Sequence, residues 1–132
     1  VTLLCPSEDY LLDDRYLKRA KEDCEKAGST FAVSYDIEHA YSGKEIVYAK
    51  SWGSLVNYGN PEIQSAENEQ HKHFIVDGQK MNLTNNAVFS HCLPLRRNIK
   101  ATDEVMDAKY CLAVKEAANR KHVQKSLLTN IL

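Results

Sequence analysis

The sequence predicts an α/β fold in which a mainly parallel sheet lies between two layers of helices, a three-layer αβα arrangement. Short apolar segments rich in β-branched and aromatic residues alternate with segments of helical periodicity along the chain. No internal repeat or low-complexity segment interrupts this alternation. With 132 residues, of which 43% are hydrophobic, the chain can bury one substantial core. We therefore expect a single domain.

Three strands are expected in the first half of the chain. Val1–Cys5 is a short apolar run that Pro6 ends, because proline cannot continue a hydrogen-bonded ladder. Thr30–Ser34 and Glu45–Lys50 are the second and third strands, since both combine β-branched or aromatic residues over a short length.

Two helices are expected between these strands. Asp13 or Asp14 can cap the first helix, whose apolar residues recur every three or four positions, and Gly28 closes it. Asp36 can cap a second, shorter helix that ends at Gly43.

Four helices are expected in the second half. A polar loop leads to a helix over about 60–73, and Asp77 can cap the next one as far as Leu83. Thr102 can cap a short helix whose first turn carries two acidic residues, which suit the positive end of the helix dipole. The final helix is expected from Glu116 onward.

Ala87–His91 and Tyr110–Val114 are expected to be the last two strands. In a doubly wound, Rossmann-like sheet, ligands bind at the carboxyl ends of the strands. The side chains that this rule places near a ligand are Asp36, Lys50–Trp52, His91–Pro94 and Lys115–Glu116.

Charge and motifs exclude several classes of function. Seventeen Lys and Arg residues against eighteen Asp and Glu give a net charge of −1, without the basic excess of a nucleic-acid-binding protein. No G-x-G-x-x-G or P-loop lysine motif is present, so we expect neither a dinucleotide nor any other cofactor. No apolar run approaches the roughly 18–20 residues of a membrane span.

The cysteines and histidines give weak signals for metals or disulfides. None of the four cysteines forms a C-x-x-C pair, so we expect no disulfide, no structural zinc and a reducing cytoplasm. His71 and His73 alternate and could bind a metal from one strand face. With no third ligand nearby, they favour a solvated segment.

The segment Phe89–Asn98 is the most informative, since an apolar strand runs into a cysteine, a proline and two arginines. In one interpretation, His91 activates Cys92 as a nucleophile, but adjacent strand residues point to opposite faces. In another, Cys92 lines a pocket and the Cys-Leu-Pro turn presents backbone carbonyls to an amide or amine. The plain alternative is a buried strand end followed by solvated arginines.

These residues resemble a known family. His91-Cys92-Leu93-Pro94 at a strand end is typical of the aspartate/ornithine carbamoyltransferase superfamily, and the run to Asp103 is most similar to the N-acetylornithine carbamoyltransferases. The resemblance covers essentially the whole chain. Its other motifs, in the same order, are Val47–Gly53, His73–Asp77, Leu83–Asn86 and Glu116–Arg120. It implies that residues 1–132 form the second, amino-acid-binding domain together with the terminal helix.

Lys50 departs from the ornithine enzymes of this superfamily, which carry an aspartate at the matching position. A lysine repels an α-ammonium and attracts an α-carboxylate, so it suits an N-acylated ornithine whose α-amine is no longer charged. We expect Lys50 to lie beside the 92–94 turn. The plain alternative is a strand-end lysine that extends into water.

The resemblance also implies roles for other residues. Cys92 and Leu93 line the carbamoyl group, chiefly through backbone oxygen, and Arg120 contacts carbamoyl phosphate. Lys100 matches a carboxylated lysine of similar enzymes. Such a carbamate requires a neutral amine in a partly buried site with basic neighbours, for which Arg96 and Arg97 are candidates.

The resemblance implies a carbamoyltransferase of arginine biosynthesis. The complete enzyme, a homotrimer, would use carbamoyl phosphate and N-acetyl-L-ornithine to form N-acetyl-L-citrulline and phosphate. The superfamily's carbamoyl-phosphate motif, Ser-x-Arg-Thr, is absent from this sequence. We therefore expect that the first domain is missing and that these 132 residues fold without turning over substrate.

Several alternatives remain open. The acyl substrate could be N-succinylornithine, or the substrate could be ornithine itself. A binding or regulatory module without activity could descend from the same domain. A cysteine-dependent hydrolase using Cys92 is the least favoured.

Overall fold

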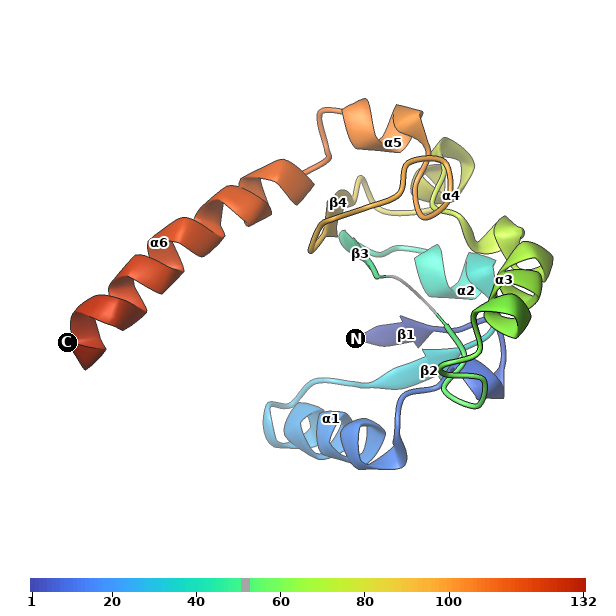
Figure 1. Cartoon of the computed structure of the whole chain (residues 1–132), viewed down its shortest axis with the longest axis horizontal. Helices are drawn as coiled ribbons and strands as arrows, with labels where there is room; N and C mark the ends of the chain where they lie inside the picture. Colours follow the sequence, from blue (N-terminus) through green and yellow to red (C-terminus); the bar gives the residue numbers. More distant parts are fainter. Residues whose placement is uncertain (51–52) are drawn as a thin grey trace. The chain divides into compact units, whose positions relative to one another are not determined.

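The computed structural model describes residues 1–50 and 53–132 and has an α/β fold with parallel strands (Figure 1). This confirms the predicted fold class, including the C-terminal helix. The described residues form two compact units, the first comprising 1–42 and 53–74 and the second 43–50 and 75–132.

The first unit is built on a pair of parallel strands, β1 (Thr2–Leu4) and β2 (Ala32–Ser34). Helix α2 (Ile37–Tyr41) contacts both strands and buries Tyr41. The other helical elements of this unit are η1 (Glu8–Tyr10), α1 (Asp14–Lys26), α3 (Pro61–Gln70) and η2 (Lys72–Phe74).

The second unit contains the strand ends on which the candidate site depends. Strands β3 (Ile46–Ala49) and β4 (Val88–His91) are parallel, and Tyr48 lies opposite Ser90. The helices of this unit are α4 (Gly78–Asn82), α5 (Asp103–Asp107) and α6 (Ala113–Ile131).

The predicted helix caps are confirmed. Asp13, Asp36 and Asp77 each accept a backbone N–H in the first turn of the helix that follows. Thr102 caps α5 in the same way, by accepting the N–H of Val105. These short side chains satisfy amides that would otherwise lack a partner inside the helix.

The core of the second unit is centred on β4. Phe89 is 0% exposed, and Val105 of α5 and Ala113 of α6 are also completely buried. Val76 is bridged to Ala101, which brings the segment before α4 against the loop before α5. The core therefore fixes the strand that leads into the His-Cys-Leu-Pro segment.

The predicted strand at 110–114 is wrong. Phe89 donates its amide to Tyr110 and accepts that of Leu112, so only a single bridge, between Phe89 and Cys111, forms here. The chain then turns into α6, which starts at Ala113 rather than at Glu116. The segment Ala113–Ala118 contains three alanines with Lys115 and Glu116, all good helix formers, and these override the short β-like pattern.

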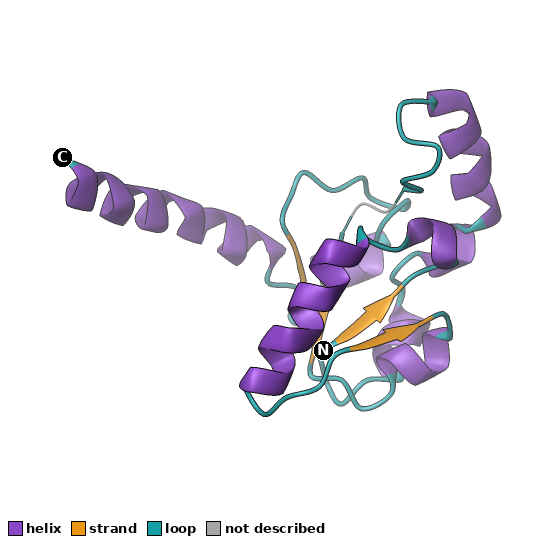
Figure 2. Cartoon of the chain, turned by 90° about the horizontal axis from the view of Figure 1, so that it is seen from below, coloured by secondary structure: helices purple, strands orange, loops and turns teal. Residues whose placement is uncertain are grey.

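Helix α6 contacts β4 near its start and then extends away from the rest of its unit (Figures 1 and 2). Val123, Leu127 and Ile131 recur every four residues along it and are all exposed. This spacing places them on one face of the helix. None of the described helices has the length and apolar character needed to cross a membrane.

Candidate functional site

Lys50 and Cys92 meet at the carboxyl ends of β3 and β4. Tyr48 is paired with Ser90 and Ala49 with His91. Lys50 and Cys92 directly follow this last pair and therefore lie next to each other. The Lys50 Nζ atom lies 3.5 Å from Cys92 Sγ and donates a hydrogen bond to it. The parallel pairing thus places a cation beside a half-buried thiol at the edge where ligands bind in such sheets.

Glu116, in the first turn of α6, binds to both strands just before this point. Its Oε1 accepts a 2.9 Å hydrogen bond from the Tyr48 hydroxyl, and its Oε2 accepts one from the Ser90 hydroxyl. These bonds, followed by the charge of Arg120 and a smaller effect of His91, lower the pKa of Glu116. The hydrogen bond to this carboxylate raises the pKa of Tyr48, because ionisation of the phenol would break it, and the negative charge of Glu116 adds to the shift.

His91 is buried, with 1% of its surface exposed. Its Nδ1 accepts the backbone N–H of Leu93 at 2.9 Å, which places the proton of the neutral ring on Nε2. Nε2 has no hydrogen-bond partner among the described residues. Burial is the main cause that lowers the pKa of His91, Lys50 and Lys100 lower it further, and Glu116 opposes the shift.

The geometry does not favour His91 as a base for Cys92. The ring nitrogen Nδ1 accepts the Leu93 amide, whereas the Cys92 sulfur accepts a hydrogen bond from Lys50. This agrees with the opposite directions of adjacent strand residues. A proton transfer from Cys92 to His91 therefore lacks the required contact.

The turn after β4 has an unusual backbone. Leu93 has φ 48°, a left-handed conformation that costs a residue with a side chain about 1–2 kcal/mol. The Leu93–Pro94 peptide bond is cis. The hydrogen bond from the Leu93 amide to the buried His91 ring ties this turn to the end of β4.

Lys100 is only 9% exposed. Burial, with a smaller contribution from Arg96, lowers its pKa because both disfavour the charged ammonium. Lys100 also lowers the pKa of His91, so the two side chains share one electrostatic environment. A buried lysine of this kind is a candidate for chemistry that needs a neutral amine.

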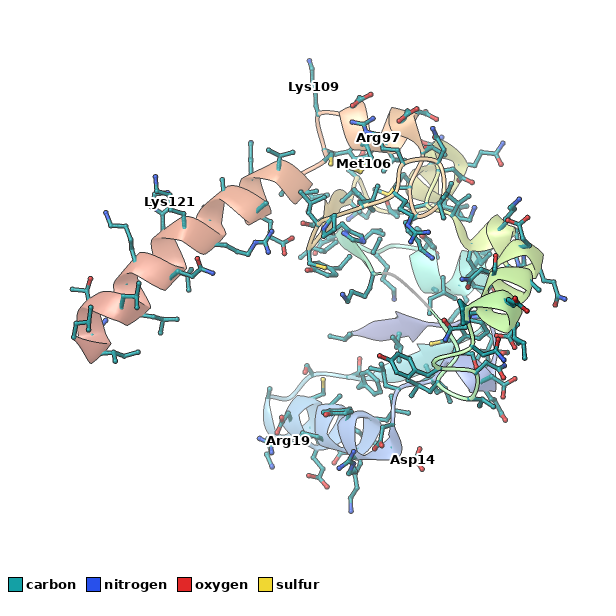
Figure 3. The ribbon with its side chains drawn as sticks, in the orientation of Figure 1. Asp14, Arg19, Arg97, Met106, Lys109 and Lys121 are labelled. Carbon is teal, nitrogen blue, oxygen red and sulfur yellow. The ribbon has the colours of Figure 1, made fainter. Side chains whose placement is uncertain are left out.

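Arg97, one of the two arginines predicted near Lys100, is bound by two aspartates. Its guanidinium bonds to Asp103 at 2.8 Å and to Asp107 at 2.6 Å, which holds it against α5 (Figure 3). These two carboxylates raise the pKa of Arg97. Of the two predicted arginines, Arg96 is one whose charge lowers the pKa of Lys100.

Arg120 is exposed and lies one helical turn after Glu116 on α6. The sequence predicts Glu116 near the strand ends but does not predict its contacts with Tyr48 and Ser90. The available signal was spacing, because Tyr48 precedes Lys50 by two residues and Ser90 precedes Cys92 by two. Residues two apart in a strand share a face.

Other predicted residues do not join this site. Ser51 and Trp52 lie outside the described residues. His71 and His73 belong to the first unit, where His71 makes edge contacts with the rings of Tyr10 and Phe74. Within 1–50 and 53–132, no three His, Cys, Asp or Glu side chains are placed to hold a metal ion.

The chain is similar to carbamoyltransferases in both sequence and structure. Residues 1–131 match the Asp/Orn binding domain of aspartate/ornithine carbamoyltransferase. The chain is 58% identical over 128 residues to the N-acetylornithine carbamoyltransferase of Xylella fastidiosa, a match that covers 97% of this chain and 38% of that protein. It is 35% identical over 130 residues to the N-succinylornithine carbamoyltransferase of Bacteroides fragilis, covering 94% of this chain and 36% of that protein.

A solved structure agrees with these sequence matches. The crystal structure of an acetylornithine transcarbamylase complexed with acetylcitrulline superposes with a TM-score of 0.94 at 55% identity, covering 100% of this chain and 40% of that one. The present chain thus spans about two fifths of the length of these relatives. From the match along 131 residues and the shared fold, we conclude that the chain belongs to the aspartate/ornithine carbamoyltransferase family.

Proposed function

We propose that the chain is the amino-acid-binding domain of an N-acetylornithine carbamoyltransferase. The complete protein transfers the carbamoyl group of carbamoyl phosphate to the δ-amine of N-acetyl-L-ornithine, giving N-acetyl-L-citrulline and phosphate, a step of arginine biosynthesis. The similarity to a 58% identical protein of that name and to a complex with acetylcitrulline supports this proposal.

The observation that carries the substrate assignment is the ammonium of Lys50 beside Cys92. An ammonium here attracts the α-carboxylate of an N-acylated ornithine, whose amide nitrogen is neutral. Free ornithine carries an α-ammonium, which Lys50 repels. The charge at one side chain therefore favours the acylated substrate over ornithine.

The reaction requires the enzyme to position its two substrates and does not require a covalent enzyme intermediate. The neutral δ-amine attacks the carbonyl carbon of carbamoyl phosphate, a C–N bond forms, the C–O bond to phosphate breaks and the amine loses a proton. Cys92 and Leu93 orient the carbamoyl group and the amine through backbone oxygen, and Arg120 polarises the carbamoyl oxygen. Fixed charges and correct orientation are then the main sources of rate enhancement.

A first domain that binds carbamoyl phosphate completes the protein in this proposal. Two observations support it: the chain corresponds to 38% of its relative, and the Ser-x-Arg-Thr motif is absent from its sequence. We place the complete enzyme in the cytoplasm as a homotrimer, and four cysteines that remain free thiols suit a reducing compartment. The 132 residues alone are expected to be inactive.

We also propose that Lys100 is carboxylated. Its neutral amine would attack carbon dioxide, forming an N–C bond and releasing one proton, and the product is a carbamate anion. Burial and a lowered pKa favour the neutral amine that this step requires. The charge of Lys100 acts on His91, whose buried Nε2–H has no partner among the described residues, and we propose this N–H as a donor to such an anion.

The test is turnover by the complete protein with N-acetyl-L-ornithine, N-succinyl-L-ornithine and L-ornithine at equal concentrations. We expect carbamoyl transfer to the acetyl substrate with the largest kcat/KM. Preference for the succinyl or free substrate would reassign the enzyme within its family. Binding of N-acetyl-L-ornithine without any transfer would indicate a binding module instead.

A further inference from the structure

The Glu116 carboxylate has no role in the chemistry proposed above, yet three elements meet at it. It belongs to α6 and accepts hydrogen bonds from Tyr48 of β3 and Ser90 of β4, one on each oxygen. Because the two oxygens bind different strands, the carboxylate constrains both strand ends relative to the helix. Hydrogen bonds to a charged acceptor are the stronger kind.

The register extends this constraint to the candidate site. Tyr48 and Ser90 are direct partners in the parallel pair. Lys50 and Cys92 each follow two residues later, which places them on the same face as the residues bound to Glu116. The contact between Lys50 and Cys92 is thus the next one along the face that Glu116 secures.

The helix extends the constraint to the arginine. Arg120 follows Glu116 by four residues, one turn of α6, and its charge acts on the same carboxylate. The first turn of a helix also suits a negative side chain, because the helix dipole is positive there. Glu116 therefore connects the element that carries Arg120 to those that carry Lys50 and Cys92.

We infer that Glu116 is a positioning residue that holds Lys50, Cys92 and Arg120 in register for carbamoyl transfer. This inference rests on the proposed function for its substrate. It assigns Tyr48 and Ser90 as the partners through which Glu116 acts. Neither Glu116 nor these partners needs to touch a substrate.

The experiment compares kcat and KM for N-acetyl-L-ornithine in the complete protein and in the Glu116→Ala and Glu116→Gln variants. Misplacement of reacting groups by about 1 Å can cost on the order of 100-fold in rate, so we expect Glu116→Ala to lose about 10- to 100-fold in kcat/KM. Glu116→Gln should recover most of this loss, because its amide can still bond to both hydroxyls. Glu45→Ala removes an exposed carboxylate next to β3 and should behave like the wild type.

A second set of variants keeps the test decisive if Glu116→Ala does not fold. Tyr48→Phe and Ser90→Ala each remove one donor, and we expect the double variant to reproduce the loss of Glu116→Ala. Adding either change to Glu116→Ala should have no further effect, since residues acting through one contact are not additive.

The folded fraction of every variant is measured by thermal unfolding, so that kcat refers to folded protein. Unchanged kcat and KM per folded molecule in Glu116→Ala, or in the Tyr48 and Ser90 double variant, would overturn the inference, because Glu116 would then act on stability alone. An equal loss in Glu116→Gln and Glu116→Ala would also count against it. A wild-type protein that fails to use N-acetyl-L-ornithine would instead refute the proposed function.

Discussion

The ε-amine of Lys50 lies 3.5 Å from the thiol sulfur of Cys92, although the two residues are 42 positions apart in the sequence. The parallel pairing of β3 and β4 produces this contact, and Glu116 binds Tyr48 and Ser90, two residues earlier on each segment. In the proposed function, this contact joins the residue that attracts the substrate carboxylate to the turn that orients the carbamoyl group.

Reversal of the charge at residue 50 should weaken use of the acylated substrate. In the complete protein, Lys50→Asp places a carboxylate against the substrate carboxylate. We expect kcat/KM for N-acetyl-L-ornithine to fall roughly 100-fold, or about 2.7 kcal/mol, since like charges at an interface cost several kcal/mol. Lys50→Arg keeps the charge and serves as the control. Unchanged kinetics in Lys50→Asp would reject the assigned role.

A carbamate on Lys100 should be detectable with labelled bicarbonate. Burial lowers the pKa of Lys100, so more of its amine is neutral near pH 7 than for an exposed lysine, and the modified fraction should rise with pH. We expect a carbamate signal in ¹³C NMR of the wild type after addition of ¹³C-bicarbonate. Lys100→Arg should abolish this signal.

Matched arginine variants refine the same measurement. Arg97→Gln should leave the carbamate signal intact, because Arg97 is bound to Asp103 and Asp107. Arg96→Gln should reduce it, since the positive charge of Arg96 favours the neutral amine of Lys100. A signal that persists in Lys100→Arg, or none in the wild type, would contradict the carbamate assignment.

His91 should make the second unit less stable as the pH falls. Its pKa is lowered in the folded state, chiefly by burial, so the unfolded chain takes up a proton near pH 6.5 while the folded chain resists it. The free energy of unfolding should therefore decline below pH 6.5, by at most about 1.4 kcal/mol per pH unit for this group, until the folded-state pKa is passed.

This pH dependence can be followed at the Phe89 amide, which donates to Tyr110 in the core. Its hydrogen-exchange protection factor should drop between pH 6.5 and 5.5. In His91→Asn, whose side-chain oxygen can still accept the Leu93 amide, the drop should be smaller because the residue does not titrate. Equal pH dependence in both proteins would exclude His91 as the cause.

Phe89→Ala should destabilise the second unit strongly. Phe89 is 0% exposed at the centre of the core, and removal of a buried phenylalanine side chain costs about 3–5 kcal/mol in transfer and cavity terms. Urea unfolding followed by far-UV circular dichroism measures this change. Ile46→Ala, at a β3 residue that is 68% exposed, should stay close to the wild type.

Local chemistry explains why the helices were predictable from sequence. Asp36, Asp77 and Thr102 cap their helices through side chains that reach only three residues along the chain. The capping residue and the helix start that it stabilises therefore lie within a few residues of each other in the sequence. The last expected strand failed for the opposite reason. Tyr110 and Leu112 bond to Phe89 around a single bridge, and Leu112 then accepts the amide of Glu116 as α6 begins.

In the candidate site, too, some contacts were predictable from the sequence and others were not. The meeting of Lys50 with Cys92 followed from the rule for carboxyl ends of parallel strands and from resemblance to a family. The contacts of Glu116 with Tyr48 and Ser90 were not predicted, since they depend on how α6 approaches the strands. The engagement of Arg97 by two aspartates likewise required the geometry of the loop before α5.

The alternation of strand side chains makes chain length critical at this site. Insertion of one residue between Tyr48 and Lys50, or between Ser90 and Cys92, would turn the later side chain to the opposite face while leaving composition almost unchanged. An insertion in the turn before β3, at Gly43–Lys44, would leave both spacings as they are. We therefore expect that insertions and deletions among related sequences occur before β3 and β4 and are rare at the last residues of these strands.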